Sequence, residues 1–360
     1  MINLRTAIRA MRSRASRREI PMHSAESLRY LVKRERFRSD RSGLEFALVA
    51  VRFLDSTERS AHAEESIVVW LQRELRITDD VGLLDDGRIG VLLPDTDRDG
   101  AEVVADRIRL ECTTFELANE IEISVYPDHD GTPTSTSTSE SERKLDPAKE
   151  SISLMQSMFI EPIPTWKRAF DMLGSGAAIV VTLPLQLAIA VAIKATSPGP
   201  VLFTQSRSGL GGQPYRIFKF RTMCVDAEDK QHLLAELNEQ DGPAFKLKSD
   251  PRLTRLGSFL RKTSLDELPQ LWNVFRGEMS LVGPRPLPCH EAESCNTWQQ
   301  YRLDVTPGIT CIWQVYGRSR VSFDRWIRMD IEYIRSRSPL QDAHLLCMTL
   351  PAVLSGRGAV

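Results

Sequence analysis

One segment limits what this chain can fold into more than any other. Met172–Ile193 is a run of 22 residues without a formally charged side chain. A helix of that length can span the hydrocarbon layer of a bilayer. The alternative is a buried helix of a soluble protein, but an ordinary helix of that kind carries a polar stripe, which this segment lacks. The segment therefore predicts a membrane anchor.

A proline and the flanking charges predict how this anchor is arranged. Pro184 lies just past its middle, where it removes a backbone hydrogen bond and kinks a helix. Basic residues stand on both sides of the segment, namely Lys167 and Arg168 before it and Lys194 and Arg207 after it. Positive flanks prefer the cytoplasmic side of a membrane. We therefore expect a re-entrant helix, at about residues 168–194, whose two ends lie at the same membrane face.

The overall charge excludes some partners. With 47 basic and 48 acidic side chains the net charge is −1, so there is no global attraction to nucleic acid, and we expect no nucleic-acid partner. Residues 1–40 are predicted to be a basic arm, which either contacts acidic lipid headgroups or is solvated. Six scattered cysteines without metal-site spacing are typical of reduced cytosolic thiols.

The part of the chain before the anchor divides into a domain and a linker. Residues 41–127 alternate between strand-like and helix-like patterns, which indicates a small α/β or α+β domain. The strands are expected at 44–53, 88–94 and 120–127, and the helices at 61–76 and 97–110. Residues 128–150 are rich in Ser and Thr and almost without apolar side chains, so a polar linker is predicted over 128–160. The second domain is predicted at 161–360.

Beyond the anchor, glycines and cations form the first candidate site. Gly209, Gly211 and Gly212 separate two strand-like runs, which predicts a β-hairpin and not a nucleotide-binding glycine loop, because no helix opens directly after them. Lys219 and Arg221 are two residues apart and share one face if the segment is extended. Two cations on one face suit a phosphate, or they belong to a solvated strand face.

An acid pair, Asp266 and Glu267, has two interpretations. Ser264 and Glu267 fit a capping box, which would make the segment a plain helix start. Alternatively, the acids lie among many cations, including Arg261, and are followed by a turn that carries Arg285. Arginine forks match phosphate, and Mg²⁺ binds through one or two carboxylates plus substrate phosphates. The second interpretation predicts a polyphosphate site with a divalent metal.

The chemistry of that site follows from its residue types. A carboxylate can attack phosphorus, and nearby cations lower its pKa and neutralise the phosphate under attack. One acid of the pair would attack or bind metal while the other orients a proton or the same ion. Further along the chain, Arg318 meets either a phosphate or the solvent.

From Lys167 to the C-terminus, the sequence resembles the bacterial sugar transferases, the monotopic phosphoglycosyl transferases. The motifs that carry the resemblance are KRAFD (167–171), SPGPVLFTQSRSGLGG (197–212), YRIFKFRTM (215–223), DPRLTRLGSFLRKTSLDELPQLWNVFRGEMSLVGPRP (250–286) and PGITCIWQVYGR (307–318). The resemblance implies a mainly α (α+β) monotopic membrane domain with a re-entrant helix. Where the family bends that helix at a Ser-Pro pair, this chain has Leu183-Pro184, with Thr182 one position earlier.

The resemblance also implies an activity. The family moves a sugar phosphate from a UDP-sugar to undecaprenyl phosphate with Mg²⁺ and releases UMP, through a phospho-aspartate. Carried over to this chain, Asp266 would be the nucleophile and a metal ligand, Glu267 its catalytic partner, and Arg285 a phosphate ligand, with Lys219, Arg221, Arg261 and Arg318 as further candidates. The implied location is the cytoplasmic face of the bacterial inner membrane. Glucose and galactose are the expected sugars.

Residues 41–127 resemble the GGDEF domain of diguanylate cyclases, in the stretch VGLLDDGRIGVLLPDTD (81–97). The signature positions hold Asp85–Ile89, without the family's glycine and acidic pairs, so cyclase activity is not expected. Arg76 and Asp79 match the R-x-x-D pattern that binds cyclic di-GMP in such domains. The domain is therefore expected either to bind cyclic di-GMP or only to mediate a homodimer.

Two functions from different classes remain at this point. The first is a membrane-bound phosphoglycosyl transferase with a degenerate regulatory domain. The second is a catalytically idle, membrane-associated adaptor that binds cyclic di-GMP. The intact acid pair and its cations favour the enzyme.

Overall fold

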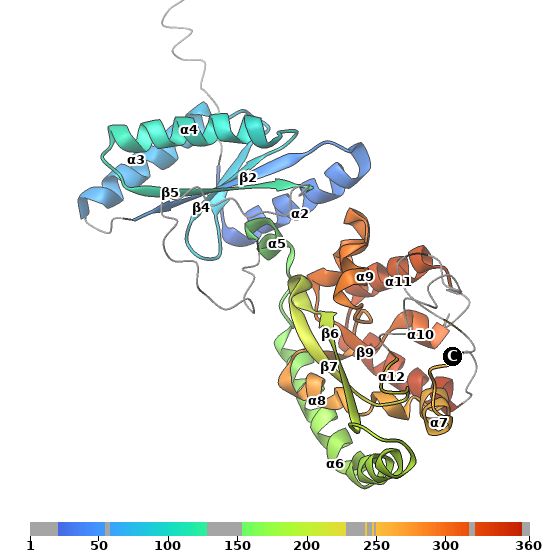
Figure 1. The fold of residues 1–360 in the computed structure, drawn as a ribbon. Helices are drawn as coiled ribbons and strands as arrows, with labels where there is room; N and C mark the ends of the chain where they lie inside the picture. The colour runs from blue at the N-terminus through green and yellow to red at the C-terminus, as the bar shows by residue number, and fades with distance from the viewer. Residues whose placement is uncertain are drawn as a thin grey trace, which may run out of the picture. The chain divides into compact units, whose positions relative to one another are not determined.

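The computed structural model divides the chain into two compact units, Met1–Phe159 and Ile160–Val360 (Figure 1). The structure describes residues 21–54, 58–127, 153–227, 242, 247, 250–316 and 321–354. The first half of the predicted basic arm, the linker at 128–152 and Arg318 lie outside the described residues.

The first unit is built on a five-stranded sheet with the strand order β1-β3-β4-β2-β5. Its strands are β1 (Met22–His23), β2 (Phe46–Phe53), β3 (Asp80–Leu83), β4 (Ile89–Leu93) and β5 (Asn119–Tyr126). All neighbours pair antiparallel except β1 and β3, which are parallel. The central strand β2 is buried over six consecutive residues, which is typical of a strand covered on both faces.

Helices cover both faces of this sheet, and the alternation of side chains along β2 creates two cores. Ala47 and Val49 belong to a core formed with α3 (Glu58–Glu74) and α4 (Arg98–Thr114). Phe46 and Leu48 point the other way, into a core formed with α2 (Ala25–Ser42) and α5 (Leu154–Phe159). Figure 1 shows α3 and α4 together on one side of the sheet.

The α/β prediction for this unit is confirmed in its three strands and two helices, but its boundaries were wrong. Residues 25–42, predicted to be part of an arm, form α2, whose Leu28 and Val32 are fully buried. The predicted linker also extended too far, because α5 packs Met155 and Phe159 into the same core. Both helices cover a sheet face that would otherwise be exposed, so the unit begins before residue 41 and ends at Phe159.

The second unit combines one long helix, a hairpin and a set of short elements. The long helix is α6 (Thr165–Thr196), and β6 (Leu202–Ser208) and β7 (Pro214–Phe220) form an antiparallel hairpin. The other elements are α7 (Arg255–Lys262), α8 (Gln270–Arg276), β8 (Ser280–Val282), α9 (Cys289–Glu293), β9 (Gly308–Thr310), α10 (Ile312–Tyr316), α11 (Phe323–Ser336) and α12 (Pro339–Leu354), with 3-10 turns η1 (Leu210–Gly212), η3 (Leu265–Glu267) and η4 (Thr297–Asp304). Strands β8 and β9 pair in parallel.

Helix α6 carries the uncharged segment, and its apolar side chains are exposed. Of the described helices, α6 is long and apolar enough to cross a membrane, and only 11% of its most apolar 18-residue window is buried. Val180 and Val181 are 72% and 78% exposed. A core helix of a soluble protein would bury these side chains, so α6 differs from the buried core helix that the sequence left as the alternative.

The helix changes direction along its length in Figure 1, and Pro184 lies inside it. The hydroxyl of Thr182 donates a hydrogen bond of 2.6 Å to the carbonyl of Ala178, and the Gln186 amide donates to the same hydroxyl at 2.9 Å. Proline removes a backbone donor, and threonine hydroxyls that bond back to a carbonyl bend helices. The two devices together account for a bend at this point.

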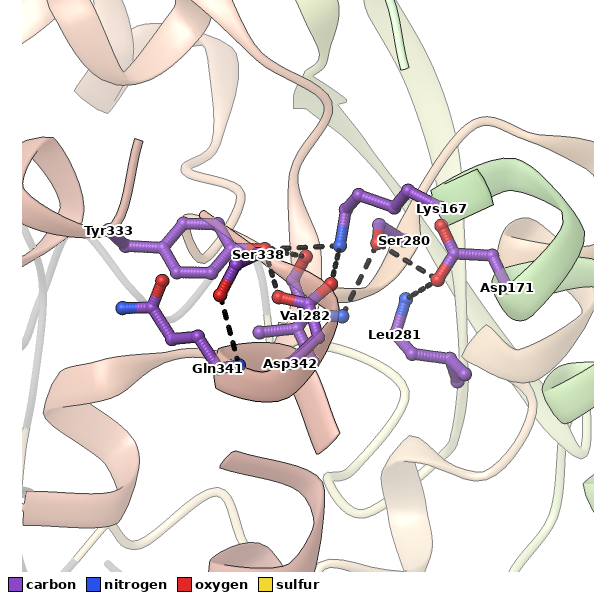
Figure 2. A network of polar contacts seen from close by, with 9 residues as sticks. All are labelled: Lys167, Asp171, Ser280, Leu281, Val282, Tyr333, Ser338, Gln341 and Asp342. Carbon is purple, nitrogen blue, oxygen red and sulfur yellow. Dashed lines mark hydrogen bonds and ion pairs between the residues drawn. The ribbon is translucent and has the colours of Figure 1, made fainter. Parts of the chain in front are cut away.

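A buried polar network fixes the first turns of α6 to the rest of the unit (Figure 2). Lys167 donates to Asp342 and, at 3.0 Å, to the hydroxyl of Tyr333. One turn further, Asp171 accepts hydrogen bonds from the Ser280 hydroxyl at 3.0 Å and the Leu281 amide at 2.9 Å, both on β8. The network therefore holds the strand that leads into the turn with Arg285.

Candidate active site

The acid pair lies on the 3-10 turn η3, directly after α7. Between α7 and η3, Ser264 adopts a left-handed conformation with φ 55°, which is uncommon for a residue other than glycine. Its side chain makes no capping hydrogen bond, so the capping-box interpretation is contradicted. Consecutive residues of a 3-10 turn point about 120° apart. Asp266 and Glu267 therefore face different surroundings.

Glu267 is held by two cations. Its Oε1 accepts a hydrogen bond from Lys219 Nζ at 2.9 Å and another from Arg285 Nη2, while Oε2 lies 3.4 Å from Arg285 Nη1. Burial alone would raise the pKa of Glu267, but Arg285 and Lys219 outweigh burial and hold this pKa well below its usual range. Glu267 is thus a permanently charged group with both oxygens engaged.

Asp266 is buried in a different way. Asp266 is 7% exposed. Its carboxylate makes no hydrogen bond or close ion pair with any residue that the structure describes. Burial, followed by the charge of Glu267, raises the pKa of Asp266 to about 6, although Lys219, Arg261 and Arg285 act in the opposite direction. The pair therefore consists of one engaged carboxylate and one carboxylate that has no partner among the described residues.

The turn at Gly283–Pro286 places Arg285 opposite Glu267. Strands β8 and β9 bring Gly283 against Gly308 so closely that a Cβ on Gly308 would lie 2.1 Å from the Gly283 nitrogen. Arg302 donates to the carbonyl of Arg285 and pairs with Asp330 at 3.0 Å. Arg302 and Asp330 are 4% and 1% exposed. A buried ion pair therefore positions the guanidinium that holds the backbone carbonyl of Arg285.

Some of the predicted phosphate-binding residues lie near Asp266 and Glu267, and others do not. Lys219, Arg261 and Arg285 surround the acids, and Arg261 also donates to the Thr222 hydroxyl at 3.1 Å. Arg221 follows the end of β7, and its Nη2 donates to the carbonyl and the hydroxyl of Ser197 at the end of α6, at 3.0 and 2.6 Å. Arg221 thus supports the helix end, and its predicted role toward phosphate stays a prediction. Arg318 lies outside the described residues.

Sequence reasoning missed two arginines of this region. Arg207 was interpreted only as a positive flank of the anchor, yet its Nη1 donates to the carbonyl of Pro286 at 3.1 Å. Arg302 was not singled out at all. The available signal for Arg207 was its position two residues before Gly209 in the predicted hairpin, which places it opposite the strand that carries Lys219.

The donor set fits a metal only in part. Among the described residues there is no group of three or more His, Cys, Asp or Glu side chains that could hold an ion. Lys219 and Arg285 compensate the charge of Glu267, whereas the carboxylate of Asp266 has no partner in the described segments. A single protein carboxylate fits Mg²⁺ when substrate phosphates complete its coordination.

The predicted cyclic di-GMP residues occupy a turn of the first unit. Asp79 is 4% exposed, and its carboxylate accepts hydrogen bonds from the Arg76 amide at 2.9 Å and the Thr78 hydroxyl at 3.3 Å. Asp79 therefore stabilises its own turn in this structure. Binding of cyclic di-GMP and formation of a homodimer stay predictions.

The fold and the site together define a class of membrane-associated protein in which an exposed apolar helix adjoins a carboxylate pair surrounded by cations. The profile of the family described as bacterial sugar transferase matches residues 163–356, and the chain belongs to this family.

Three relatives illustrate the similarity. The galactosyl transferase CpsE of Streptococcus agalactiae serotype III is 41% identical over 194 residues, which cover 54% of this chain and 43% of that protein. The undecaprenyl-phosphate galactose phosphotransferase of Salmonella typhimurium is 38% identical and covers 54% of this chain and 41% of that protein. The exopolysaccharide production protein ExoY of Rhizobium meliloti is 38% identical, covering 54% and 87%. The chain thus spans about two fifths of the length of the first two relatives.

Solved structures resemble the chain only distantly. A diguanylate cyclase protein from Thermotoga maritima matches with a TM-score of 0.28 and 16% identity, covering 30% of this chain and 84% of that one. Because this likeness is too slight to carry an argument, the GGDEF-like character of the first unit stays a prediction.

Proposed function

We propose that the protein transfers a sugar-1-phosphate from a UDP-sugar to undecaprenyl phosphate. The products are undecaprenyl-diphospho-sugar and UMP, and the reaction would prime an exopolysaccharide or another surface glycan. Family membership supports this proposal, as do the names of the Salmonella typhimurium and Rhizobium meliloti relatives. The sugar is proposed to be galactose or glucose.

The difference between the two acids carries the mechanistic part of the proposal. A nucleophile must be free to approach its electrophile. Within the described part of the chain Asp266 has no hydrogen-bond partner, whereas both oxygens of Glu267 are engaged. An oxygen of ionised Asp266 would attack the β-phosphorus of the donor. The bond from that phosphorus to the bridging oxygen then breaks, and UMP leaves with the electron pair.

The second half-reaction returns the enzyme to its starting state. A phosphate oxygen of undecaprenyl phosphate attacks the phosphorus of the aspartyl phosphate, the bond to Asp266 breaks, and the carboxylate is restored. Glu267 would fix Lys219 and Arg285 so that these cations stabilise the charge that develops on phosphorus. Mg²⁺, held by Asp266 and the substrate phosphates, would supply further neutralisation of the diphosphate when bound.

The second part of the proposal concerns how α6 lies in the membrane. The exposed apolar surface of α6 and its Pro184 support a re-entrant helix with both ends at the cytoplasmic face of the inner membrane. Single cysteines placed near residues 168 and 194, in a background without other accessible thiols, should react with an impermeant reagent from the same side of the membrane. Reaction from opposite sides would show a crossing helix and refute this arrangement.

A covalent-adduct assay tests the mechanism. The full chain in lipid nanodiscs, given a UDP-sugar labelled at the β-phosphate and no lipid acceptor, should acquire label and release one equivalent of UMP. Addition of undecaprenyl phosphate should remove the label. Asp266→Asn should abolish labelling, because an amide is a poor nucleophile, while Asp250→Asn, a matched change outside the acid pair, should still permit it. Labelling of the Asp266→Asn variant would refute the assignment.

A further inference from the structure

The hairpin that carries Lys219 also carries a second polar pair on the same face. Arg207 on β6 and Tyr215 on β7 lie directly opposite each other in the antiparallel register. Opposite residues project to the same side of a hairpin with their Cβ atoms about 5 Å apart. Tyr215 and Lys219 share a face as well, because side chains alternate along a strand. One hairpin face therefore runs from the cation of the acid pair to Arg207 and Tyr215.

Polar atoms of this pair are buried without a partner. Arg207 Nε and the Tyr215 hydroxyl are both inaccessible to solvent and make no hydrogen bond in the part of the chain that the structure describes. Buried polar groups in native proteins are nearly always hydrogen-bonded, and an unsatisfied one costs free energy. Other unsatisfied buried atoms are scattered over the described residues, but these two lie on directly paired residues of one hairpin face, where a single ligand would satisfy both.

The geometry of Arg207 defines what kind of ligand fits. Its Nη1 is used, donating to the carbonyl of Pro286, while no described residue accepts a bond from Nε or Nη2. The edge formed by Nε and Nη2 presents two parallel donors, the arrangement that binds a phosphate in a bidentate manner. Burial and the neighbouring charge of Arg285 lower the pKa of Arg207 to about 10, so the guanidinium is still charged near neutral pH.

The bond to Pro286 also fixes the location of this edge. Pro286 follows Arg285 directly, so the carbonyl that orients Arg207 belongs to the same turn that places Arg285 against Glu267. A diphosphate has two phosphoryl groups a few ångströms apart. If one of them reacts beside Asp266, the other needs its own cation, and among the described residues Arg207 is a nearby cation with an unused pair of donors.

We propose that Arg207 and Tyr215 form a second phosphoryl-binding subsite, which holds the non-reacting phosphoryl group of the nucleotide donor. This inference rests on the proposed function, because it assigns part of the same substrate. Arg207 supplies a bidentate guanidinium edge, and the Tyr215 hydroxyl donates a third hydrogen bond. The phosphate of the lipid acceptor has the same chemistry, so the test has separate arms for the two substrates.

The first test replaces the arginine. With the full chain in nanodiscs, Arg207→Gln should raise the KM for the UDP-sugar about tenfold or more, since a charge-assisted pair contributes on the order of one to two powers of ten. It should weaken inhibition by UMP to a similar degree. Arg207→Lys keeps the charge but loses the two parallel donors of the guanidinium. Its KM for the UDP-sugar should therefore lie between those of the parent and Arg207→Gln. The KM for undecaprenyl phosphate should change less than twofold.

The second test removes one oxygen atom and keeps the fold. Because the Tyr215 hydroxyl has no hydrogen-bond partner among the described residues, Tyr215→Phe should leave the unfolding temperature unchanged or slightly raised, yet raise the KM for the donor several-fold. Tyr333→Phe is the matched control. That hydroxyl lies 2.8 Å from Asp342 Oδ1 and 3.1 Å from the Val282 carbonyl, so its removal should lower the unfolding temperature.

The outcomes distinguish the subsite from the function on which it rests. If the parent protein releases no UMP from any UDP-sugar, the proposed function fails first. If the parent is active and only the KM for the lipid rises in the variants, the subsite binds the acceptor's phosphate. If both KM values and UMP inhibition are unchanged in Arg207→Gln and Tyr215→Phe, or if only kcat falls, Arg207 merely supports the turn and the subsite is refuted.

Discussion

The buried carboxylate of Asp266 leads to a prediction that separates stability from activity. Asp266→Asn keeps the shape of the side chain and removes its charge. Burial and the charge of Glu267 raise the pKa of Asp266 from 3.8 to about 6, which means that the folded state disfavours the ionised form. At 1.36 kcal/mol for each pH unit, this difference corresponds to about 3 kcal/mol. The variant should therefore be inactive but more stable than the parent by about 3 kcal/mol near pH 8.

The stability difference between Asp266→Asn and the parent should depend on pH. Below about pH 3, Asp266 is protonated in the folded and the unfolded chain, so the substitution should change stability little. As the pH rises from about 4 to about 6, the unfolded chain ionises first and the parent loses stability, whereas the variant has no proton to lose at this position. The advantage of the variant should appear across this interval and persist above it.

Thermal unfolding of the full chain in detergent, without divalent cations or nucleotides, measures the effect. In a unit of about 200 residues, 1 kcal/mol shifts the unfolding temperature by roughly 2–4 °C, so a shift of roughly 6–12 °C is expected near pH 8. A variant that is no more stable than the parent near pH 8, or equally stabilised at pH 4 and pH 8, would refute the reasoning.

Asp250→Asn is the matched control, because Asp250 is also buried, at 8% exposure. Its carboxylate accepts hydrogen bonds from Arg252 Nε at 2.9 Å and Nη2 at 2.7 Å. Although burial raises the pKa of Asp250, these bonds outweigh burial and lower it. The same substitution should therefore lower the unfolding temperature at this position, which separates a specific effect of Asp266 from a general preference for asparagine.

Three further predictions follow from single groups. UMP release should increase as the pH rises through about 6, because Asp266 must be ionised to attack, and a rate that falls over this interval would contradict that role. Lys167→Met should lower the free energy of unfolding by about 3–5 kcal/mol in thermal or denaturant unfolding, because Asp342 loses its buried cation; a loss below 1 kcal/mol would show that the network is not stabilising. Ser264→Ala should change stability by less than about 0.5 kcal/mol, since Ser264 caps nothing, whereas Thr254→Ala should cost about 1 kcal/mol, because Thr254 caps α7 through the Gly257 amide; equal losses would contradict the geometry.

The sequence alone determined the features that depend on local patterns. An uncharged, apolar run of 22 residues is long enough for a membrane-spanning helix, so the apolar helix α6 and a kink at Pro184 were predictable. Alternating strands and helices between residues 44 and 127 predicted β2, β4 and β5 with α3 and α4, but not β1, β3, α2 or α5, and the glycine turn predicted the β6–β7 hairpin. The motif that contains Asp266 and Glu267 indicated an acid pair among cations.

The tertiary structure decided which groups of that site meet. Asp266 and Glu267 are adjacent in the chain and chemically alike. The left-handed Ser264 and the 3-10 turn direct Glu267 toward Lys219 and Arg285, while Asp266 has no partner among the residues that the structure describes. In the same way, the sequence indicated Arg207 only as a positive residue after the apolar segment. The hairpin register places it opposite Tyr215, and its Nη1 donates to the carbonyl of Pro286. The physical reason is that pKa values and hydrogen bonds depend on the distances to side chains from distant parts of the chain. A local pattern of residues does not specify those distances.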